Sequence, residues 1–223
     1  MIKVISVFKR KAGMEVDEFQ DYWLNHHGPI VARLPSVGRY VQSHTRRSGY
    51  ARHEPAADGL SELWFADTDA LYNLQSSQEL QQISDDEERF IDLTSSVQIL
   101  VDEHVIKDGP ALVEGVKNIE FVRRKSEMDV DTFQHHWRKI HGPLGASIKQ
   151  VSRYVQNHAK SSSYLNGRSP KLDGLALTWF KDVDAMRESA QSAEYEVTRE
   201  DEGNFLTIPL DFIIAQEHVL LGQ

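Results

Sequence analysis

The chain carries an internal duplication that can be read without any outside alignment. A set of aromatic and polar residues in the first half returns 114 positions later with the same identities and the same spacing. The set comprises Phe19-Gln20, Trp23, His27-Gly28-Pro29, Arg39-Tyr40-Val41-Gln42 and His44, and its copy comprises Phe133-Gln134, Trp137, His141-Gly142-Pro143, Arg153-Tyr154-Val155-Gln156 and His158. Each repeat spans about 110 residues, which is enough for one small domain. The sequence therefore predicts two similar units in one chain.

The distance between equivalent residues changes along the repeat. It is 114 positions at both ends, as for Ile5 and Ile119, and 115 positions in the middle, as for Trp64 and Trp179. One insertion near Asn166 and one deletion towards the end of the second repeat account for the change. Residues that match across this offset can be compared as two copies of one ancestral position.

The expected domain boundaries follow from the repeat. We expect a first unit at residues 1–106 and a second unit at residues 116–223. Residues 107–115 are the expected linker, because they include the pair Gly109-Pro110, which is typical of loops.

The pattern of apolar residues predicts the same order of elements in both units. In the first unit we expect strands at 2–8, 37–46, 60–65 and 97–105. We expect a first helix capped by Asp17 and interrupted at Gly28-Pro29, because proline cannot continue helical hydrogen bonding. A second helical region should begin at Asp67. The order β-α-β-β-α-β is that of a ferredoxin-like unit.

A four-stranded sheet with helices on one face leaves its other face bare, and a bare apolar face is unstable in water. Two fused copies can cover these faces by packing sheet against sheet. The expected fold is therefore α+β, with two fused ferredoxin-like units forming an intramolecular pseudo-twofold αβ barrel around a cavity.

Composition narrows the possible functions. The chain has 223 residues, 40% of them hydrophobic, no cysteine and a formal net charge of −9. The lack of cysteine removes disulfides, thiol nucleophiles and thiolate metal sites. The negative charge repels phosphate backbones, so nucleic acid is not an expected partner. No apolar stretch approaches ~18 residues and the first residues have the pattern of a strand, so we expect no membrane association and a cytoplasmic location.

The duplicated polar residues suggest where chemistry could occur. Side chains alternate along a strand, so Tyr40, Gln42 and His44 should share one face. Along the next strand, Glu62 and Trp64 should point away from the helices and towards the cavity. We expect these side chains to converge there, joined by His104 from the last strand of the repeat.

Each of these residues also has a structural interpretation. A histidine kept in both copies can simply satisfy a buried hydrogen bond, which applies above all to His104 and His218. His27 can serve packing and capping at the bend of the first helix as well as chemistry. Trp23 and Trp137 are expected to be core aromatics.

Known cofactor motifs are absent from the sequence. No histidine pair has the i, i+4 spacing of a helical zinc site, and no glycine-rich nucleotide loop or nucleophile elbow is present. We therefore expect no metal and no cofactor, and chemistry that uses His, Tyr, Asp, Glu and water.

The motifs Phe19-Gln20-x-x-Trp23-x-x-x-His27-Gly28-Pro29, Arg39-Tyr40-Val41-Gln42-x-His44 and Asp58-Gly59 before Trp64-Phe65 resemble those of the EthD family. The resemblance covers nearly the whole chain, twice. It implies the dimeric αβ-barrel superfamily, which includes cofactor-free monooxygenases, polyketide cyclases, decarboxylases, dehydratases, isomerases and haem enzymes. Many relatives are homodimers of a single unit, whereas this chain fuses two units, so its two sites can diverge.

The two copies have in fact diverged. Glu62 corresponds to Leu177, and Ser6 corresponds to Glu120. A carboxylate beside an apolar cavity is the environment that tunes a carboxyl group for acid–base work. The first copy is therefore the expected working site, and Glu120 leaves the second copy as the alternative.

The leading functional hypothesis is a cofactor-independent lyase for a small aromatic or polyketide-like substrate. It would catalyse a decarboxylation, a dehydration, an aldol-type cyclisation or the loss of a small carbonyl fragment. His44 is the expected base, Tyr40 the oxyanion donor and Glu62 a second acid–base group, with His27 as a further donor. The expected substrate-binding residues are Gln42, Trp64, Tyr50 and His104.

The sequence alone is also consistent with other functions. Within enzymes, the alternative is a cofactor-free monooxygenase or isomerase. Outside enzymes, it is a carrier of a small molecule or of haem, or a structural accessory protein. The fused chain could also form a homodimer.

Overall fold

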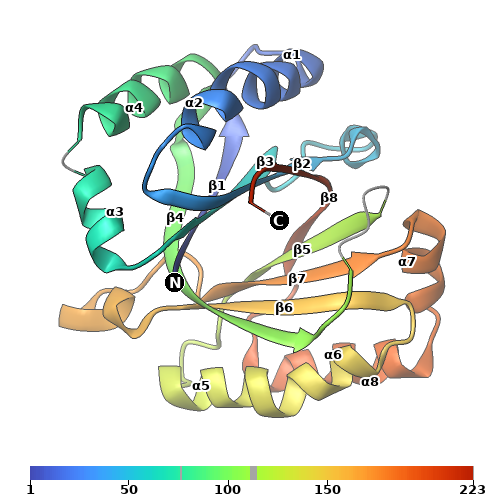
Figure 1. Cartoon of the computed structure of the whole chain (residues 1–223). Coiled ribbons are helices and arrows are strands. Elements are labelled where there is room, and N and C mark those ends of the chain that lie inside the picture. Colours follow the sequence, from blue (N-terminus) through green and yellow to red (C-terminus); the bar gives the residue numbers. More distant parts are fainter. Residues whose placement is uncertain (76, 111–114, 223) are drawn as a thin grey trace. The chain divides into compact units, whose positions relative to one another are not determined.

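A computed structural model gives the fold of the chain (Figure 1) and describes residues 1–75, 77–110 and 115–222. Residues 111–114 of the expected linker lie outside the described residues.

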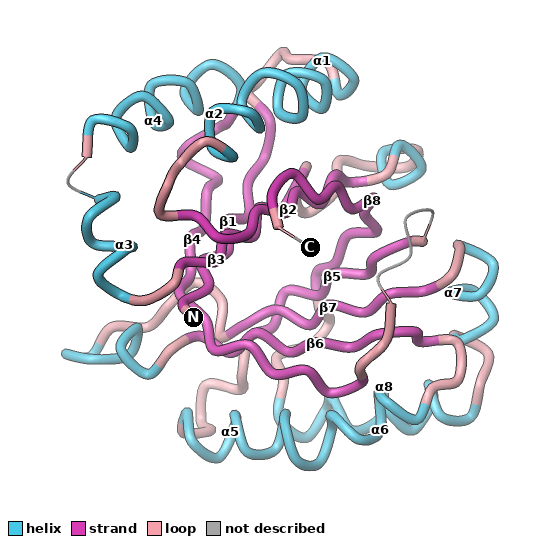
Figure 2. Tube along the Cα trace, in the orientation of Figure 1, coloured by secondary structure: helices cyan, strands magenta, loops and turns pink. Residues whose placement is uncertain are grey.

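The first repeat has the expected order of elements (Figures 1 and 2). Its elements are β1 (Ile2–Arg10), α1 (Val16–Tyr22), the π-helical turn η1 (Trp23–His27), α2 (Gly28–Ala32), β2 (Val37–Thr45), the 3-10 turn η2 (Arg47–Tyr50), β3 (Gly59–Phe65), α3 (Thr68–Gln75), α4 (Gln78–Phe90) and β4 (Ile91–Lys107). Strand β4 begins earlier than the sequence pattern predicts. The first helix begins after Glu15, so the prediction that Asp17 caps it is wrong; Asp17 lies in the first turn instead.

The second repeat has the same order of elements. They are β5 (Val116–Val122), α5 (Val130–His136), the π-helical turn η3 (Trp137–His141), α6 (Gly142–Ser147), β6 (Val151–Ala159), the 3-10 segment η4 (Ser161–Gly167), β7 (Gly174–Phe180), α7 (Val183–Ser189), α8 (Ala193–Phe205) and β8 (Asp211–Leu221). Asn166, at the predicted insertion, has a positive φ of 60°.

The strands are hydrogen-bonded in the closed order β1-β3-β2-β8-β5-β7-β6-β4 of a barrel. In the first repeat β3 pairs antiparallel with both β1 and β2, and in the second repeat β7 pairs in the same way with β5 and β6. The α+β class and the pair of fused ferredoxin-like units predicted from the sequence are therefore confirmed.

The compact units of the structure differ from the sequence repeats in the last strand of each repeat. One unit consists of Met1–Leu100 with the chain from Glu217 onward, and the other consists of Val101–Gln216. Strands β4 and β8 each contribute to both units. The second half of β4 pairs with β6, and the first half of β8 pairs with β5. Each unit is therefore completed by the last strand of the other repeat.

One tryptophan per unit joins the first helix to the sheet. The Trp23 ring is buried and stacks on the His44 ring, with 4.2 Å between centroids and 8° between planes. The amide Nε2 of Gln42 donates to the Trp23 carbonyl oxygen at 3.0 Å. Trp137 makes the equivalent contacts with His158 and Gln156. The prediction that both tryptophans are core residues is confirmed.

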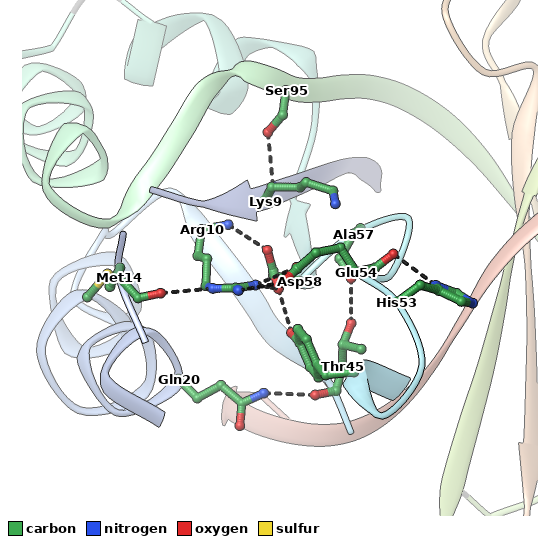
Figure 3. Close-up of polar contacts among 11 residues, drawn as sticks. Lys9, Arg10, Met14, Gln20, Thr45, His53, Glu54, Ala57, Asp58 and Ser95 are labelled. Carbon is green, nitrogen blue, oxygen red and sulfur yellow. Dashed lines mark hydrogen bonds and ion pairs between the residues drawn. The ribbon is translucent and has the colours of Figure 1, made fainter. Parts of the chain in front are cut away.

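The loop after β2 is fixed by a buried aspartate (Figure 3). Asp58, 1% exposed, accepts hydrogen bonds from the guanidinium of Arg10 at 2.6 Å and from the hydroxyl of Tyr50 at 2.5 Å. Arg10 also binds Glu54, and Thr45 donates to the carbonyl oxygen of Ala57. The loop is thus tied to the end of β1, and Tyr50 is held as a structural element of this network.

Replacing either of two glycines of the second unit by alanine should change the free energy of unfolding, but in opposite directions. A Cβ at Gly174 would lie 2.3 Å from the carbonyl oxygen of Asn157 and 2.6 Å from the Trp137 ring, so backbone and indole must both shift. Gly174→Ala should lower the free energy of unfolding by about 1–3 kcal/mol. A Cβ at Gly203, inside α8, meets nothing within 4 Å, so Gly203→Ala should raise it by about 0.5–1 kcal/mol. Urea unfolding of both variants checks the pair; a stable Gly174→Ala protein would contradict the packing described for Trp137.

Candidate active site

The residues predicted to share one space lie on opposite faces of the first sheet. Residues directly opposite one another on paired strands share a face. The register places Tyr40 opposite Leu63 and Val41 opposite Glu62. Tyr40 belongs to the core cluster beneath the helices. The prediction that Glu62 joins Tyr40 and His44 is therefore wrong.

Glu62 is instead paired with a buried lysine on the other face. Its carboxylate lies 2.9 Å from the ammonium of Lys3, and both side chains are 3% exposed. The same ammonium lies 4.4 Å from the centroid of the Trp64 ring, and the Arg39 guanidinium lies 5.0 Å from that ring. Glu62 and Trp64 thus point away from the helices, as predicted, but they form a packed cationic and aromatic cluster there.

Tyr40, Gln42 and His44 form a closed chain of hydrogen bonds. Gln42 donates to the Tyr40 hydroxyl at 2.6 Å, and its Oε1 lies 2.8 Å from His44 Nε2. Burial and the neighbouring His218, at 4.6 Å between ring centroids, lower the pKa of His44 to about 3. Burial raises the pKa of Tyr40 above its ordinary value. Both side chains are therefore neutral near pH 7.

His104 belongs to the second unit, not the first. Its ring meets the His158 ring edge to face, with 4.7 Å between centroids. This placement follows from the pairing of the second half of β4 with β6. The expectation that His104 joins the site of the first repeat is wrong for that reason.

A cavity of about 170 Å³ lies between the sheet and the helices of the first unit. Its apolar lining comes from β1, β3, β4 and the helices: Val4, Phe8, Trp23, Val31, Leu34, Leu63, Phe65, Leu71, Leu74, Leu80, Ile83 and Ile91. Its polar lining comprises Ser6, His27, Ser61, Gln75, Glu87 and Gln98. Neither Tyr40 nor His44 is among the described residues that line it, whereas His27 is.

His27 is oriented by a carboxylate from α4. Its Nδ1 lies 2.8 Å from Asp86 Oδ2, and the Tyr22 hydroxyl donates to Asp86 Oδ1 at 2.7 Å. Burial acts against the charge of Asp86, but these hydrogen bonds hold its pKa below the ordinary value. Burial lowers the pKa of His27, although Asp86 opposes the shift. The ring is therefore neutral near pH 7, with its proton on Nδ1 and the lone pair of Nε2 available.

Glu87 is the titratable carboxyl group of the cavity lining. Burial, and next the charge of Asp86, raise the pKa of Glu87 to about 7. Adjacent residues on a helix point in different directions, so Asp86 reaches His27 while Glu87 lines the cavity. The apolar cavity is thus bordered by a neutral imidazole and a carboxyl group that exchanges its proton near neutral pH.

The sequence did not single out Asp86 and Glu87 as site residues, although a signal for them was present. At the offset of 115 positions they match Asp201 and Glu202, so this acidic pair is kept in both repeats. It lies within a charged helical stretch, where acidic residues usually face solvent, and so it did not stand out among its neighbours.

The second unit has an equivalent cavity of about 60 Å³. His141 Nδ1 lies 3.1 Å from Asp201 Oδ2, and the ring of His136 reaches the same carboxylate at 3.0 Å. Burial, and next the charge of Glu120, raise the pKa of Glu202 to about 8. The His, Asp and Glu side chains of the first cavity are therefore all present in the second.

Among residues 1–75, 77–110 and 115–222, no group of three His, Cys, Asp or Glu side chains could hold a metal ion. No helix in the same described ranges is long and apolar enough to cross a membrane.

The sequence of the chain matches the EthD domain twice, at residues 11–94 and 125–208. These two matches cover most of both repeats and include the His27 and His141 motifs. The chain therefore belongs to the EthD family, as a tandem duplication. A comparison with curated protein sequences found no match.

Solved structures share the fold over almost the full length of the chain. An anthrone oxidase-like protein aligns with a TM-score of 0.69 and 10% identity, over 98% of this chain and 93% of the other. A provisionally named monooxygenase from Fusobacterium nucleatum aligns with a TM-score of 0.63 and 10% identity, over 98% and 93%. A similarly named protein from Lactobacillus acidophilus aligns with a TM-score of 0.59 and 12% identity, over 98% and 94%. At these identities the likeness concerns the fold.

The buried, neutral state of His44 should appear in the pH dependence of stability. An unfolded histidine binds a proton below about pH 6.5, whereas folded His44 binds one only near pH 3, so this group stabilises the fold above pH 6.5 and loses that contribution as the pH falls. Between pH 6 and 4 the free energy of unfolding of the wild type should fall more steeply than that of His44→Gln, by about 1.4 kcal/mol per pH unit. Urea unfolding across this range gives both slopes, with the exposed His53, changed to Gln, as the control. Equal slopes for wild type and His44→Gln would contradict the buried neutral state.

Proposed function

We propose that the cavity of the first unit binds a small, largely apolar molecule and that Glu87 moves a proton on it. The observation that carries this proposal is the placement of a carboxyl group with a pKa of about 7 on the wall of an apolar cavity, beside a histidine oriented by Asp86. A general acid–base group works best when its pKa lies near the operating pH. Clefts with few polar groups and one perturbed carboxyl are typical binding and catalytic sites.

The volume of the cavity limits the substrate. An engineered apolar cavity of about 150 Å³ holds one benzene molecule. The first cavity, at about 170 Å³, matches a molecule with one six-membered ring. Haem, with its four pyrrole rings, does not fit this space, so the cavity does not support the haem-carrier alternative.

Each polar side chain of the cavity has a role in this proposal. Ionised Glu87 takes a proton from a carbon or oxygen of the substrate, and protonated Glu87 can return it. His27 offers the lone pair of Nε2 to a substrate hydroxyl. The hydroxyl of Ser61 and the amide of Gln98 can donate to the oxygen on which negative charge develops.

Tyr40 and His44 become positioning residues in this account. Their chain of hydrogen bonds through Gln42 ends on the Trp23 carbonyl oxygen, at the start of the turn that ends at His27. His27 stays in the proposed site, but it accepts through Nε2 instead of donating as the sequence suggested, because its Nδ1 is engaged with Asp86.

Proton transfer by Glu87 is the step shared by the lyase reactions expected from the sequence. In a dehydration, Glu87 removes a proton beside a carbonyl group, and the resulting enolate expels hydroxide, which leaves as water after protonation. In a decarboxylation, the bond to the carboxylate breaks, CO2 leaves, and protonated Glu87 supplies the proton to the remaining carbanion. Both reactions need only the groups on the cavity wall.

A second candidate is oxygenation without a cofactor. Three solved structures that share the fold, an anthrone oxidase-like protein and two provisionally named monooxygenases, support oxygenation as the second candidate. Glu87 would take one proton from a CH2 group to give a carbanion that O2 oxidises. The carbon loses both hydrogens and becomes a carbonyl carbon with one oxygen atom, and the other oxygen atom leaves with the two hydrogens as water.

Deuterium exchange tests the proton transfer that both candidates share. Cyclohexanone, a one-ring ketone with acidic C–H bonds, is incubated with the protein in D2O, and its NMR signals report exchange. We expect faster exchange with wild-type protein and about a hundredfold loss of that acceleration in Glu87→Gln, the scale of a lost acid–base group. The rate should rise with pH around pH 7, because the base is the ionised form of Glu87.

The duplicated unit supplies the control. Glu202→Gln makes the same chemical change in the second cavity and should leave exchange of cyclohexanone unchanged. Equal damage from both variants, or no acceleration by the wild type, would contradict the proposal. An oxygen electrode in the same assay separates the two candidates, because only oxygenation consumes O2.

The proposed chemistry should not depend on a metal ion. Exhaustive treatment with EDTA should leave the exchange rate unchanged, because the acid–base groups are carboxyl and imidazole side chains. Loss of activity that one divalent ion restores would contradict a cofactor-independent mechanism.

A further inference from the structure

The lining of the second cavity has become polar at positions where the first is apolar. Equivalent positions are compared at the offsets of the repeat, and all of the following line their respective cavities. The replacements are Val4 by Asn118, Leu63 by Thr178, Leu74 by Ser189, Leu80 by Tyr195 and Ile83 by Thr198, and Ser6 is replaced by Glu120. His27, Phe65 and Glu87 keep their identities as His141, Phe180 and Glu202. The duplicated cavity has kept its acid–base groups and changed what it can enclose.

The new charges form one connected cluster. Arg199, at the position of Ser84, donates to Glu120 Oε1 at 3.1 Å and to Glu202 Oε1 at 2.8 Å. The Arg199 side chain is 36% exposed, and those of Glu120 and Glu202 are 21% and 5% exposed. One guanidinium is thus shared by two carboxyl groups that are less exposed than it is.

The charge balance of this cluster decides the kind of ligand that it favours. Burial lowers the pKa of His141 and raises the pKa of Tyr154, and both are neutral near pH 7. Burial also raises the pKa of Tyr195, so this third ring on the wall is neutral too. Burial raises the pKa of both carboxyl groups, that of Glu202 to about 8, so the cavity is close to neutral near pH 7 and reaches a net charge of about −1 only at higher pH, when both are ionised. A net charge of −1 is costly in a buried site. A bound monocation would neutralise it, whereas an anion would meet two carboxylates.

We propose that the cavity of the second unit is a separate binding site for a small cation with N–H donors, such as a primary ammonium group, held between Glu120 and Glu202. Hydroxyl oxygens from Thr178 and Thr198 complete the lining with further acceptors. The volume of about 60 Å³ admits only a few non-hydrogen atoms, since one water needs roughly 10–15 Å³. A six-membered ring is excluded, so the two units would bind ligands of different chemistry.

Methylammonium is the probe, and isothermal titration calorimetry on the full chain at pH 8.5 is the measurement. We expect saturable binding of methylammonium and none of tetramethylammonium, which has the same charge but no N–H donor and a larger volume. Glu120→Ser, which restores the residue of the first repeat, should weaken binding by about tenfold or more, the effect of a lost hydrogen bond to a charged group.

Arg199→Gln should change the affinity in the opposite direction. It removes the competing cation, so binding of methylammonium should become tighter, a result that partial unfolding cannot produce. Ser6→Ala, at the position of the first repeat that corresponds to Glu120, is the matched control and should leave the affinity unchanged. Circular dichroism confirms that each variant is folded.

Proton release gives an independent readout. Glu202 holds a proton over part of the neutral range and should release it when a cation binds, together with any proton held by Glu120. Calorimetry at pH 7.5 in two buffers with different ionisation enthalpies should show release of up to about one proton per cation, and less in Glu202→Gln. The absence of methylammonium binding, equal binding of tetramethylammonium, or an affinity unaffected by Glu120→Ser would each overturn the proposal. These outcomes are independent of the cyclohexanone assay, which tests the first cavity.

Discussion

The packing of one indole between helix and sheet sets the geometry of each unit. Trp23 is stacked on His44, and its carbonyl oxygen accepts both the Gln42 amide and the backbone N–H of Gly28. The last bond closes a π-helical turn, which suits a chain whose next residue, Pro29, has no N–H to donate. The turn ends at His27, and this places the imidazole against Asp86 on α4. Because the same contacts recur around Trp137, the position of the His–Asp pair is built into both repeats.

Duplication within one chain explains how two related cavities can differ. Each keeps a histidine oriented by an aspartate and a glutamate with a raised pKa, as in Glu87 and Glu202. The walls around these groups have diverged, with apolar side chains in the first unit and hydroxyl, amide and charged groups in the second. A homodimer of single units cannot diverge in this way, because each substitution would appear in both copies. The structure is that of an EthD-family chain in which one scaffold supports two environments for the same titratable groups.

The sequence predicted the fold well, because the periodicity of apolar residues gives the same order of elements in both halves of the duplication. It also predicted which side chains of one strand share a face, as for Tyr40, Gln42 and His44. It did not predict which residues of neighbouring strands share a face. Alternation does not fix the register of β2 against β3, which includes an irregularity between Val37 and Arg39, so Glu62 was assigned to the wrong neighbours. The exchange of strands that brings His104 to the second unit depends on pairing over long distances, which a local pattern does not contain.

The proposed chemistry depends on the ionisation of the Glu87 carboxyl group, and NMR can observe this ionisation directly. The carboxyl carbon of Glu87, labelled with 13C and assigned by comparison with Glu87→Gln, is followed from pH 4 to pH 9. If the group lies on the wall of an apolar cavity next to Asp86, its midpoint should be near pH 7. A midpoint near 4.5, the ordinary value for glutamate, would show that Glu87 is solvated like a surface residue and would contradict an acid–base site beneath the helices of the first unit.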